Sequence, residues 1–192
     1  MESTAYRQIM EAKLQQRSKV IWLTGLPCSG KTTIGLGLEK ELISRGFYAR
    51  MLDGDITRRG ICNDLGFSEP DRKENIRRIA EISKLFSETG IITISAFITP
   101  TEALRTMARE IIGENDYLNI FIDAPLYLCE QRDVKGMYKK ARHVEIKDFT
   151  GVSAPFEPPL SADYVIDTKI NNPAQSVAKL LEHILPQIST SK

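Results

Sequence analysis

The chain has 192 residues, of which 42% are hydrophobic and 27% are charged, and its formal net charge is +1. These values are typical of one globular domain and exclude disordered, fibrous and membrane-spanning proteins, while the near-zero charge argues against nucleic acid as a partner. The three cysteines are scattered, and residues Met1 to Lys19 lack the apolar stretch of a signal peptide. The sequence also has no run of about 20 apolar residues. We therefore expect a cytoplasmic protein with no membrane contact.

Apolar periodicity predicts strands that alternate with helices along the chain. The first half contains a polar helix over about residues 4–16, a strand from Val20 to Thr24, a helix ending at Gly46, a strand from Tyr48 to Leu52, and a helix ending at Gly90. The second half contains a strand from Ile91 to Phe97, a helix opened by Thr99 and Pro100, a strand from Leu118 to Ile122, a short helix from Pro125 to Arg132, a strand from Tyr164 to Ile166, and a helix from Val177 to Ile188. This order predicts an α/β fold with a mainly parallel five-stranded sheet, helices on both faces, and ligands at the carboxyl ends of the strands.

One long segment, residues 134–162, has no clear helical or strand period and contains Pro155, Pro158 and Pro159. A connection of this length in a compact domain is usually functional. We therefore expect a mobile lid loop at residues 134–162, on a single domain of residues 1–192 whose residues 1–18 form a helical extension.

Residues 25–32 match the phosphate-loop pattern G-x-x-x-x-G-K-[ST], between a predicted strand and a predicted helix. Gly25 and Gly30 allow backbone N–H groups to turn toward a phosphate at a helix N-terminus. Lys31 adds a positive charge, and the Thr32 hydroxyl is a ligand for the Mg²⁺ that accompanies ATP. The alternative, a glycine-rich turn with an accidental lysine, does not explain the flanking strand and helix. The expected ATP contacts are Gly25, Leu26, Pro27, Cys28, Ser29, Gly30, Lys31, Thr32 and Thr33.

Two carboxylates, Asp53 and Asp55, follow the second predicted strand, where an acceptor hydroxyl would approach the phosphate loop. A turn with helix-capping aspartates is the alternative interpretation. Farther along, Phe67 and Asn75 lie among several basic residues, and arginine suits phosphate or sulfate while an aromatic face suits a purine. Spacing alone does not select the binding residues from the solvated ones among Arg58, Arg59, Arg72, Lys73, Arg77 and Arg78.

Two long strings resemble the adenylylsulfate kinase family. The first is Leu52 to Gly60 with Asp64 to Phe86, and the second is Asp133 to Arg142 with Phe149 to Pro159. The resemblance runs from about Val20 to Val165. It implies a three-layer P-loop NTPase fold and a kinase that uses ATP and Mg²⁺ to phosphorylate the 3'-hydroxyl of adenosine 5'-phosphosulfate (APS), giving 3'-phosphoadenosine 5'-phosphosulfate and ADP. Kinases of this family serve sulfate assimilation and also the sulfation of metabolites. It also implies a homodimer.

The same resemblance implies roles for individual residues. Asp55 would lie near the hydroxyl and, with Thr32, near the metal, and Lys31 would act in catalysis. Phe67 would stack on the substrate adenine, opposite either Phe149 or Phe156. The phosphosulfate would be held by Arg58, Arg72 and Asn75, with Asp53 and Ile98 as further substrate contacts. Arg132 would lie near the ATP base, and the positive charge of the closing lid would come from Lys135, Lys139 and Lys140.

Two positions depart from the family pattern. Thr99 stands where the family has a serine that is annotated in some members as a phosphorylated intermediate, and Ile56 replaces a common asparagine. Direct in-line transfer of a phosphoryl group needs no covalent intermediate. We therefore interpret Thr99 as a residue at the start of a helix that touches substrate, and not as a nucleophile.

Three other functions are alternatives to this one. Another P-loop small-molecule or nucleotide kinase shares the fold, but the acceptor strings favour the adenylylsulfate kinase. A non-catalytic nucleotide-binding regulatory module would not need Asp55, Arg58, Arg72 and Asn75. A sulfotransferase would not need the Lys31 and Thr32 arrangement for a metal-bound triphosphate.

Overall fold

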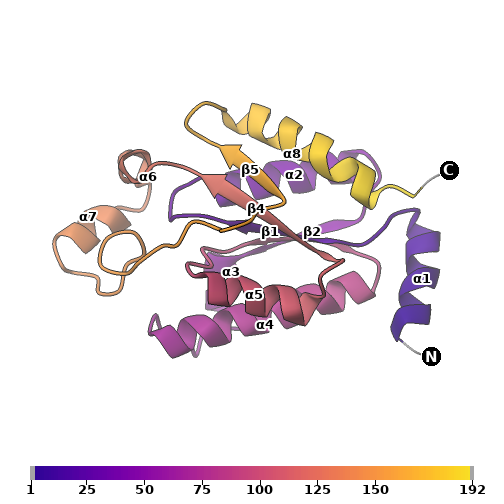
Figure 1. The fold of residues 1–192 in the computed structure, drawn as a ribbon, viewed down its shortest axis with the longest axis horizontal. Helices are drawn as coiled ribbons and strands as arrows, with labels where there is room; N and C mark the ends of the chain where they lie inside the picture. Colours follow the sequence, from indigo (N-terminus) through magenta and orange to yellow (C-terminus); the bar gives the residue numbers. More distant parts are fainter. Residues whose placement is uncertain (1–2, 191–192) are drawn as a thin grey trace.

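A parallel sheet forms the centre of the computed structural model, which describes residues 3–190 (Figure 1). Within these residues the sheet has five strands in the order β2-β3-β1-β4-β5, and all neighbouring strands are parallel. The strands are β1 (Val20–Thr24), β2 (Ala49–Asp53), β3 (Ile92–Ala96), β4 (Tyr117–Asp123) and β5 (Tyr164–Asp167). The predicted parallel sheet is therefore confirmed, and the carboxyl ends of all five strands meet at one edge.

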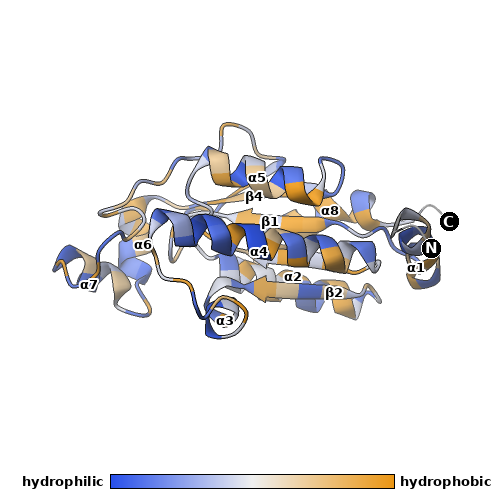
Figure 2. Cartoon of the chain, turned by 90° about the horizontal axis from the view of Figure 1, so that it is seen from below, coloured by the Kyte–Doolittle hydropathy of each residue, from blue (hydrophilic) through white to orange (hydrophobic). Residues whose placement is uncertain are grey.

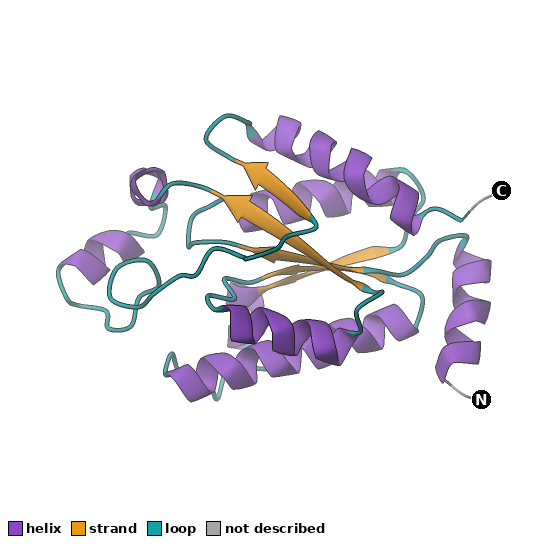
Figure 3. Ribbon diagram, viewed as in Figure 1, coloured by secondary structure: helices purple, strands orange, loops and turns teal. Residues whose placement is uncertain are grey.

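Helices cover both faces of the sheet, which gives the predicted three-layer fold (Figure 3). One face is covered by α2 (Lys31–Ser44) and α8 (Pro173–Ile188), and the other by α4 (Glu69–Glu88) and α5 (Glu102–Ile112). The remaining helices are α1 (Ser3–Leu14), α3 (Gly54–Arg59), α6 (Leu126–Arg132) and α7 (Met137–Arg142). Among residues 3–190, no helix combines the length and the apolar composition that a membrane span requires.

Strand β1 is buried on both faces, as a central parallel strand must be. Ile21 and Leu23 pack in the core beneath α2 and α8, whereas Val20 and Trp22 pack in the core beneath α4 and α5. Figure 2 shows β1 as hydrophobic and the outward side of α4 as largely hydrophilic. The alternation of side chains along the strand therefore divides one apolar run between two cores.

Several helix boundaries differ from the sequence expectation. The helix expected to open at Thr99 begins at Glu102, and the Thr101 hydroxyl caps it by accepting a hydrogen bond from the backbone N–H of Leu104 at 3.4 Å. Helix α4 begins at Glu69, ahead of its apolar stripe, because Ser68 caps it. Two helices of six residues, α3 and α7, were not predicted, because so short a segment displays less than two turns of period.

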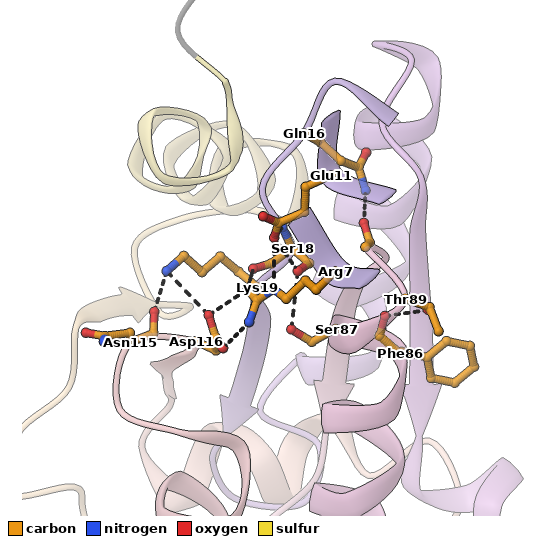
Figure 4. Close-up of polar contacts among 11 residues, drawn as sticks. Arg7, Glu11, Gln16, Ser18, Lys19, Phe86, Ser87, Thr89, Asn115 and Asp116 are labelled. Carbon is orange, nitrogen blue, oxygen red and sulfur yellow. Dashed lines mark hydrogen bonds and ion pairs between the residues drawn. The ribbon is translucent and has the colours of Figure 1, made fainter. Parts of the chain in front are cut away.

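Polar contacts fasten α1 to the amino ends of the strands (Figure 4). The Arg7 guanidinium forms a bidentate pair with Asp116 and donates to the backbone carbonyl of Ser18 at 2.9 Å. The Gln16 side chain donates to the carbonyls of Gly90 at 2.7 Å and Tyr48 at 3.0 Å. In Figure 1, α1 lies at the end of the molecule opposite α6 and α7.

Candidate active site

The phosphate loop joins β1 to α2 at the carboxyl edge of the sheet. Gly25 has φ 152°, and a Cβ there would lie 2.5 Å from the carbonyl oxygen of Ile122, so no other residue fits. Gly30 has φ 111° and begins α2 with no side-chain cap among the described residues. The first-turn N–H groups of α2 are therefore available to an anion, which the positive end of the helix dipole also favours.

The Lys31 side chain folds back into this loop. Its ammonium donates to the backbone carbonyls of Gly25 at 2.8 Å and Leu26 at 2.6 Å, and the residue is buried. Burial lowers the pKa of Lys31 to about 8. Neutral carbonyls offset only part of the cost of burying an ammonium, so a phosphate oxyanion in the loop is a stronger partner.

The two predicted carboxylates have different environments. Asp53 is buried and caps α3 by accepting from the N–H groups of Asp55 at 2.9 Å and Ile56 at 3.4 Å, and its other oxygen accepts from the Thr32 hydroxyl at 2.8 Å. The Asp55 side chain is 60% exposed and forms an ion pair with Lys135 from the lid. Although β3 separates β2 from β1, the contact between Thr32 and Asp53 brings the carboxylates to the phosphate loop.

The donor set near Thr32 fits Mg²⁺. The Thr32 hydroxyl gives its hydrogen to Asp53, so its oxygen lone pairs remain free for a cation, and Asp55 adds an accessible carboxylate. Mg²⁺ prefers oxygen ligands and, in phosphoryl-transfer sites, takes only one or two carboxylates with the substrate phosphates. Within residues 3–190, no group of three or more His, Cys, Asp or Glu side chains is arranged to hold a metal by itself.

Arg58 and Arg72 form a positively charged site around Phe67. Their guanidinium carbons lie 4.5 Å and 5.9 Å from the centre of the Phe67 ring, and they donate to the backbone carbonyls of Gly66 at 2.9 Å and Phe67 at 2.8 Å. Burial lowers the pKa of both arginines, and the charge of Arg58 further lowers that of Arg72. Because neither guanidinium contacts a carboxylate in the described chain, an anion would be favoured here.

Two other basic residues of α4, Arg77 and Arg78, are already neutralised. Arg77 pairs with Glu74 at 2.7 Å, and Arg78 pairs with Asp64 at 2.7 Å and with Glu74 at 2.9 Å. Asn75 is buried in the same helix, and its side-chain oxygen has no hydrogen-bond partner among residues 3–190. The carboxylate partners thus separate Arg77 and Arg78 from Arg58 and Arg72, which spacing could not do.

The lid segment around Phe149 contacts this positive site. Arg72 donates to the Thr150 hydroxyl at 3.0 Å and to the backbone carbonyl of Asp148. Phe156 instead stacks on Phe121 of β4, with ring centres 6.2 Å apart. Of the two candidate lid phenylalanines, Phe149 is therefore the one whose chain neighbours touch Arg72.

Two of the predicted lid lysines, Lys135 and Lys139, differ in whether they reach the site, and Ile98 lies beside β1. The Lys139 side chain is exposed on α7, and among the described residues it is Lys135 that reaches the site through its pair with Asp55. The carbonyl of Ile98 accepts from the Thr24 hydroxyl at 2.7 Å, which holds this segment beside β1.

Thr99 is almost fully buried, with 1% of its surface exposed. Its hydroxyl accepts a hydrogen bond from the indole N–H of Trp22 at 2.9 Å, and its φ is 45°. Because the hydroxyl is buried and bonded to Trp22, it is suited to holding residues 98–100 in position beside the site.

Arg132 braces the phosphate loop from α6. It donates to the carbonyl of Ser29 at 3.1 Å and to the carbonyl of Thr168 at 2.7 Å. The Thr168 hydroxyl also donates to Ser29 at 3.0 Å. Sequence reasoning missed Thr168, although its position directly after the fifth strand, at the ligand-binding edge, was a usable signal.

The chain is similar to known proteins over most of its length. The sequence model of the family described as adenylylsulphate kinase matches residues 17–167. Adenylyl-sulfate kinases of Bacteroides fragilis and Bacteroides thetaiotaomicron are 57% and 56% identical over 183 and 182 residues, which cover 95% of this chain and 91% and 90% of theirs. The structure of the Mycobacterium tuberculosis APS kinase CysC in complex with AMPPNP and APS has a TM-score of 0.85 and 35% identity, and the match covers 88% of this chain and 98% of that one.

Proposed function

The chain belongs to the adenylylsulphate kinase family and is an ATP-dependent kinase that phosphorylates APS, and we propose that the phosphate loop and the Arg58 and Arg72 pair are its two substrate sites. The observation that carries this assignment is the pair of guanidinium groups around Phe67 without a carboxylate partner in residues 3–190. A phosphosulfate supplies the missing negative charge, and its adenosine supplies a purine for the aromatic ring.

On the donor side, the first-turn N–H groups of α2 and the Lys31 ammonium bind the ATP phosphates. Lys31 exchanges the carbonyls of Gly25 and Leu26 for phosphate oxygens when ATP enters. Thr32 and Asp55 hold Mg²⁺, which when bound offsets the charge on the phosphoryl oxygens during transfer. Arg132 keeps the loop in shape through Ser29.

On the acceptor side, Asp55 orients the 3'-hydroxyl of APS and takes its proton. Within residues 3–190 its exposed carboxylate is held only by Lys135, and an ion pair between two side chains that are each 60% exposed is weak enough to open for substrate. Asp53 acts through Thr32 and the start of α3 instead of touching substrate. Thr99 holds its segment against Trp22 and forms no covalent intermediate.

The APS site uses residues of α3, of α4, of the segment between these helices, and of the lid. Arg58, Arg72 and Asn75 bind the phosphosulfate, and Asn75 brings a buried oxygen that lacks a partner in the described structure. Phe67 and Phe149 enclose the adenine. Support for Phe149 comes from its two chain neighbours, Asp148 and Thr150, which both accept hydrogen bonds from Arg72.

The test is product analysis with the purified protein, Mg-ATP, and APS or a control panel of AMP, gluconate and shikimate. We expect ADP and a product heavier than APS by one phosphoryl group. Asp55→Asn should lose turnover by about 10² to 10⁴-fold while nucleotide affinity is largely kept. Turnover of another acceptor in place of APS, or near-normal turnover by Asp55→Asn, would contradict the corresponding assignment.

We also propose that residues 1–192 act as one cytoplasmic kinase domain that forms a homodimer. Free cysteines at positions 28, 62 and 129 are typical of a reducing compartment. The exposed apolar side chains Leu36 and Ile43 of α2, with Tyr48 nearby in sequence, supply surface for self-association. Light scattering should give about twice the chain mass of 21.6 kDa, and a single-chain mass would refute the dimer.

A further inference from the structure

We propose that Tyr138 is a positioning residue that couples the ATP site to the APS site. The inference rests on the function proposed above. The Tyr138 hydroxyl donates to the backbone carbonyl of Pro27 in the phosphate loop at 3.0 Å. Its ring and that of Phe149 pack in a T-shaped arrangement, with ring centres 4.9 Å apart and planes at 79°. One side chain of α7 therefore touches both the donor loop and the residue proposed to cover the acceptor adenine.

Tyr138 is buried in a small apolar cluster that is separate from the two cores of the sheet. The cluster joins the phosphate loop, α6, α7 and the lid, through Leu26, Cys28, Leu126, Cys129, Tyr138 and Phe149. Packed apolar groups do not deform continuously, so a displacement of one segment is passed to the others. Movement of the lid around an acceptor would reach the phosphate loop through this cluster.

The hydrogen bond from Tyr138 fixes the peptide unit between Pro27 and Cys28 in the phosphate loop. The next residue, Cys28, has φ 60°, which is the left-handed region that residues other than glycine rarely adopt. Because a peptide unit is planar, holding the Pro27 carbonyl also sets the direction of the Cys28 N–H, within the loop that receives the phosphates. Burial raises the pKa of Tyr138, so its hydroxyl remains a donor near neutral pH.

The acceptor end of the connection is Arg72. It donates to both chain neighbours of Phe149, at Asp148 and Thr150. An anion bound to Arg72 competes for the same N–H groups and so repositions Phe149 against Tyr138. A continuous path of contacts therefore runs from Arg72 to the Phe149 segment, from Phe149 to Tyr138, and from Tyr138 to Pro27. Such a path is tested physically by measuring the coupling between the two sites.

The experiment measures the affinity for AMPPNP with Mg²⁺ by calorimetry, first alone and then with saturating APS. The ratio of the two dissociation constants is the coupling factor, and the reciprocal experiment on APS must give the same factor. We expect wild type to bind AMPPNP more tightly when APS is present. Tyr138→Phe keeps the ring and removes one buried hydrogen bond, so its coupling factor should fall by about five-fold.

The matched control is Tyr127→Phe, because Tyr127 is 51% exposed on α6. It should keep the wild-type coupling factor, and thermal unfolding of both variants checks that they are folded. A wild-type coupling factor in Tyr138→Phe, no coupling in wild type, or equal weakening of AMPPNP binding with and without APS would overturn the proposal. Failure of wild type to phosphorylate APS would instead refute the proposed function, so the two failures are distinguishable.

Discussion

The burial of Lys31 makes nucleotide binding sensitive to alkaline pH. Burial lowers its pKa from 10.5 to about 8, because the folded loop disfavours the charged form. A bound phosphate favours the charged form and raises the pKa again, so binding above about pH 8 takes up a proton. The dissociation constant for AMPPNP should be flat below pH 8 and rise up to about tenfold per pH unit from there toward pH 10.5.

Calorimetry in buffers of different ionisation enthalpy measures that proton uptake directly. Lys31→Met has no such proton to take up, so its weaker binding should lose the alkaline slope. An identical slope in the variant would assign the titration to another group.

Charge compensation distinguishes Arg72 from Arg77 on the same helix. Arg72 contacts only carbonyls, a hydroxyl and an aromatic ring within residues 3–190, whereas Arg77 is paired with Glu74. Since one charge-assisted hydrogen bond contributes about 1.5–3 kcal/mol, Arg72→Ala should weaken APS binding by about 10 to 100-fold. Arg77→Ala should change it by less than about two-fold, because an exposed ion pair contributes little. Equal effects of the two substitutions on the APS dissociation constant would refute the proposed anion site.

At the scale of elements, α1 is a stabilising attachment whose removal should not alter chemistry. The side chains of Arg7 and Asp116 are 22% and 20% exposed, and Arg7→Met would leave Asp116 and the Ser18 carbonyl without this donor. We expect a loss of about 1–3 kcal/mol in the free energy of unfolding, or roughly 2–4 °C in Tm for each kcal/mol. Turnover of the folded variant should match wild type, because α1 lies far from the phosphate loop (Figure 1).

The matched substitution is Arg45→Met, which breaks an exposed pair with Glu41 at 3.8 Å. Its cost should be about 0–0.5 kcal/mol by the same thermal measurement. Equal Tm values for the two variants would show that the Arg7 contacts add no stability.

Helices that present a full apolar stripe were predictable, and the others were not. Ile76 and Ile79 mark the buried face of α4, and Leu180 and Ile184 that of α8. By contrast, α3 forms because Asp53 caps it, and α7 is anchored by the burial of Tyr138 and Ala141. The lid expected to lack regular structure over residues 134–162 therefore contains a helix.

At the scale of the whole molecule, the segment of residues 134–162 contacts both the phosphate loop, through Tyr138, and Arg72, through Thr150. Its basic residues Lys139, Lys140, Arg142 and Lys147 are exposed and are trypsin sites. Ligands that engage the loop and Arg72 should close the lid, so AMPPNP, Mg²⁺ and APS together should slow cleavage in residues 139–147 more than either nucleotide alone. Mass spectrometry of the fragments measures this.

Cleavage at Lys13 and Arg17 is the internal control, because both are exposed near the opposite end of the molecule. Slowing of the same size at these residues would indicate general stabilisation instead of lid closure.

Local patterns were sufficient for the alternating elements and the phosphate loop. The apolar run from Val20 to Thr24 predicts a buried strand, because a central parallel strand is buried on both faces. The phosphate loop needs glycine at positions 25 and 30, because its backbone has positive φ angles there. The family resemblance added the acceptor, which no spacing rule could supply. The activity was therefore predictable from the sequence and its family resemblance, without a structure.

Only the tertiary structure decided how the candidate residues divide their roles. Asp53 and Asp55 are two residues apart, yet one caps a helix beneath Thr32 and the other faces the lid. Likewise, Arg72 differs from Arg77 only in its partners, and Tyr138 gains its place from Pro27, more than a hundred residues earlier in the chain. Burial, charge compensation and hydrogen bonding depend on groups that folding brings together from distant positions, and no local pattern contains that information.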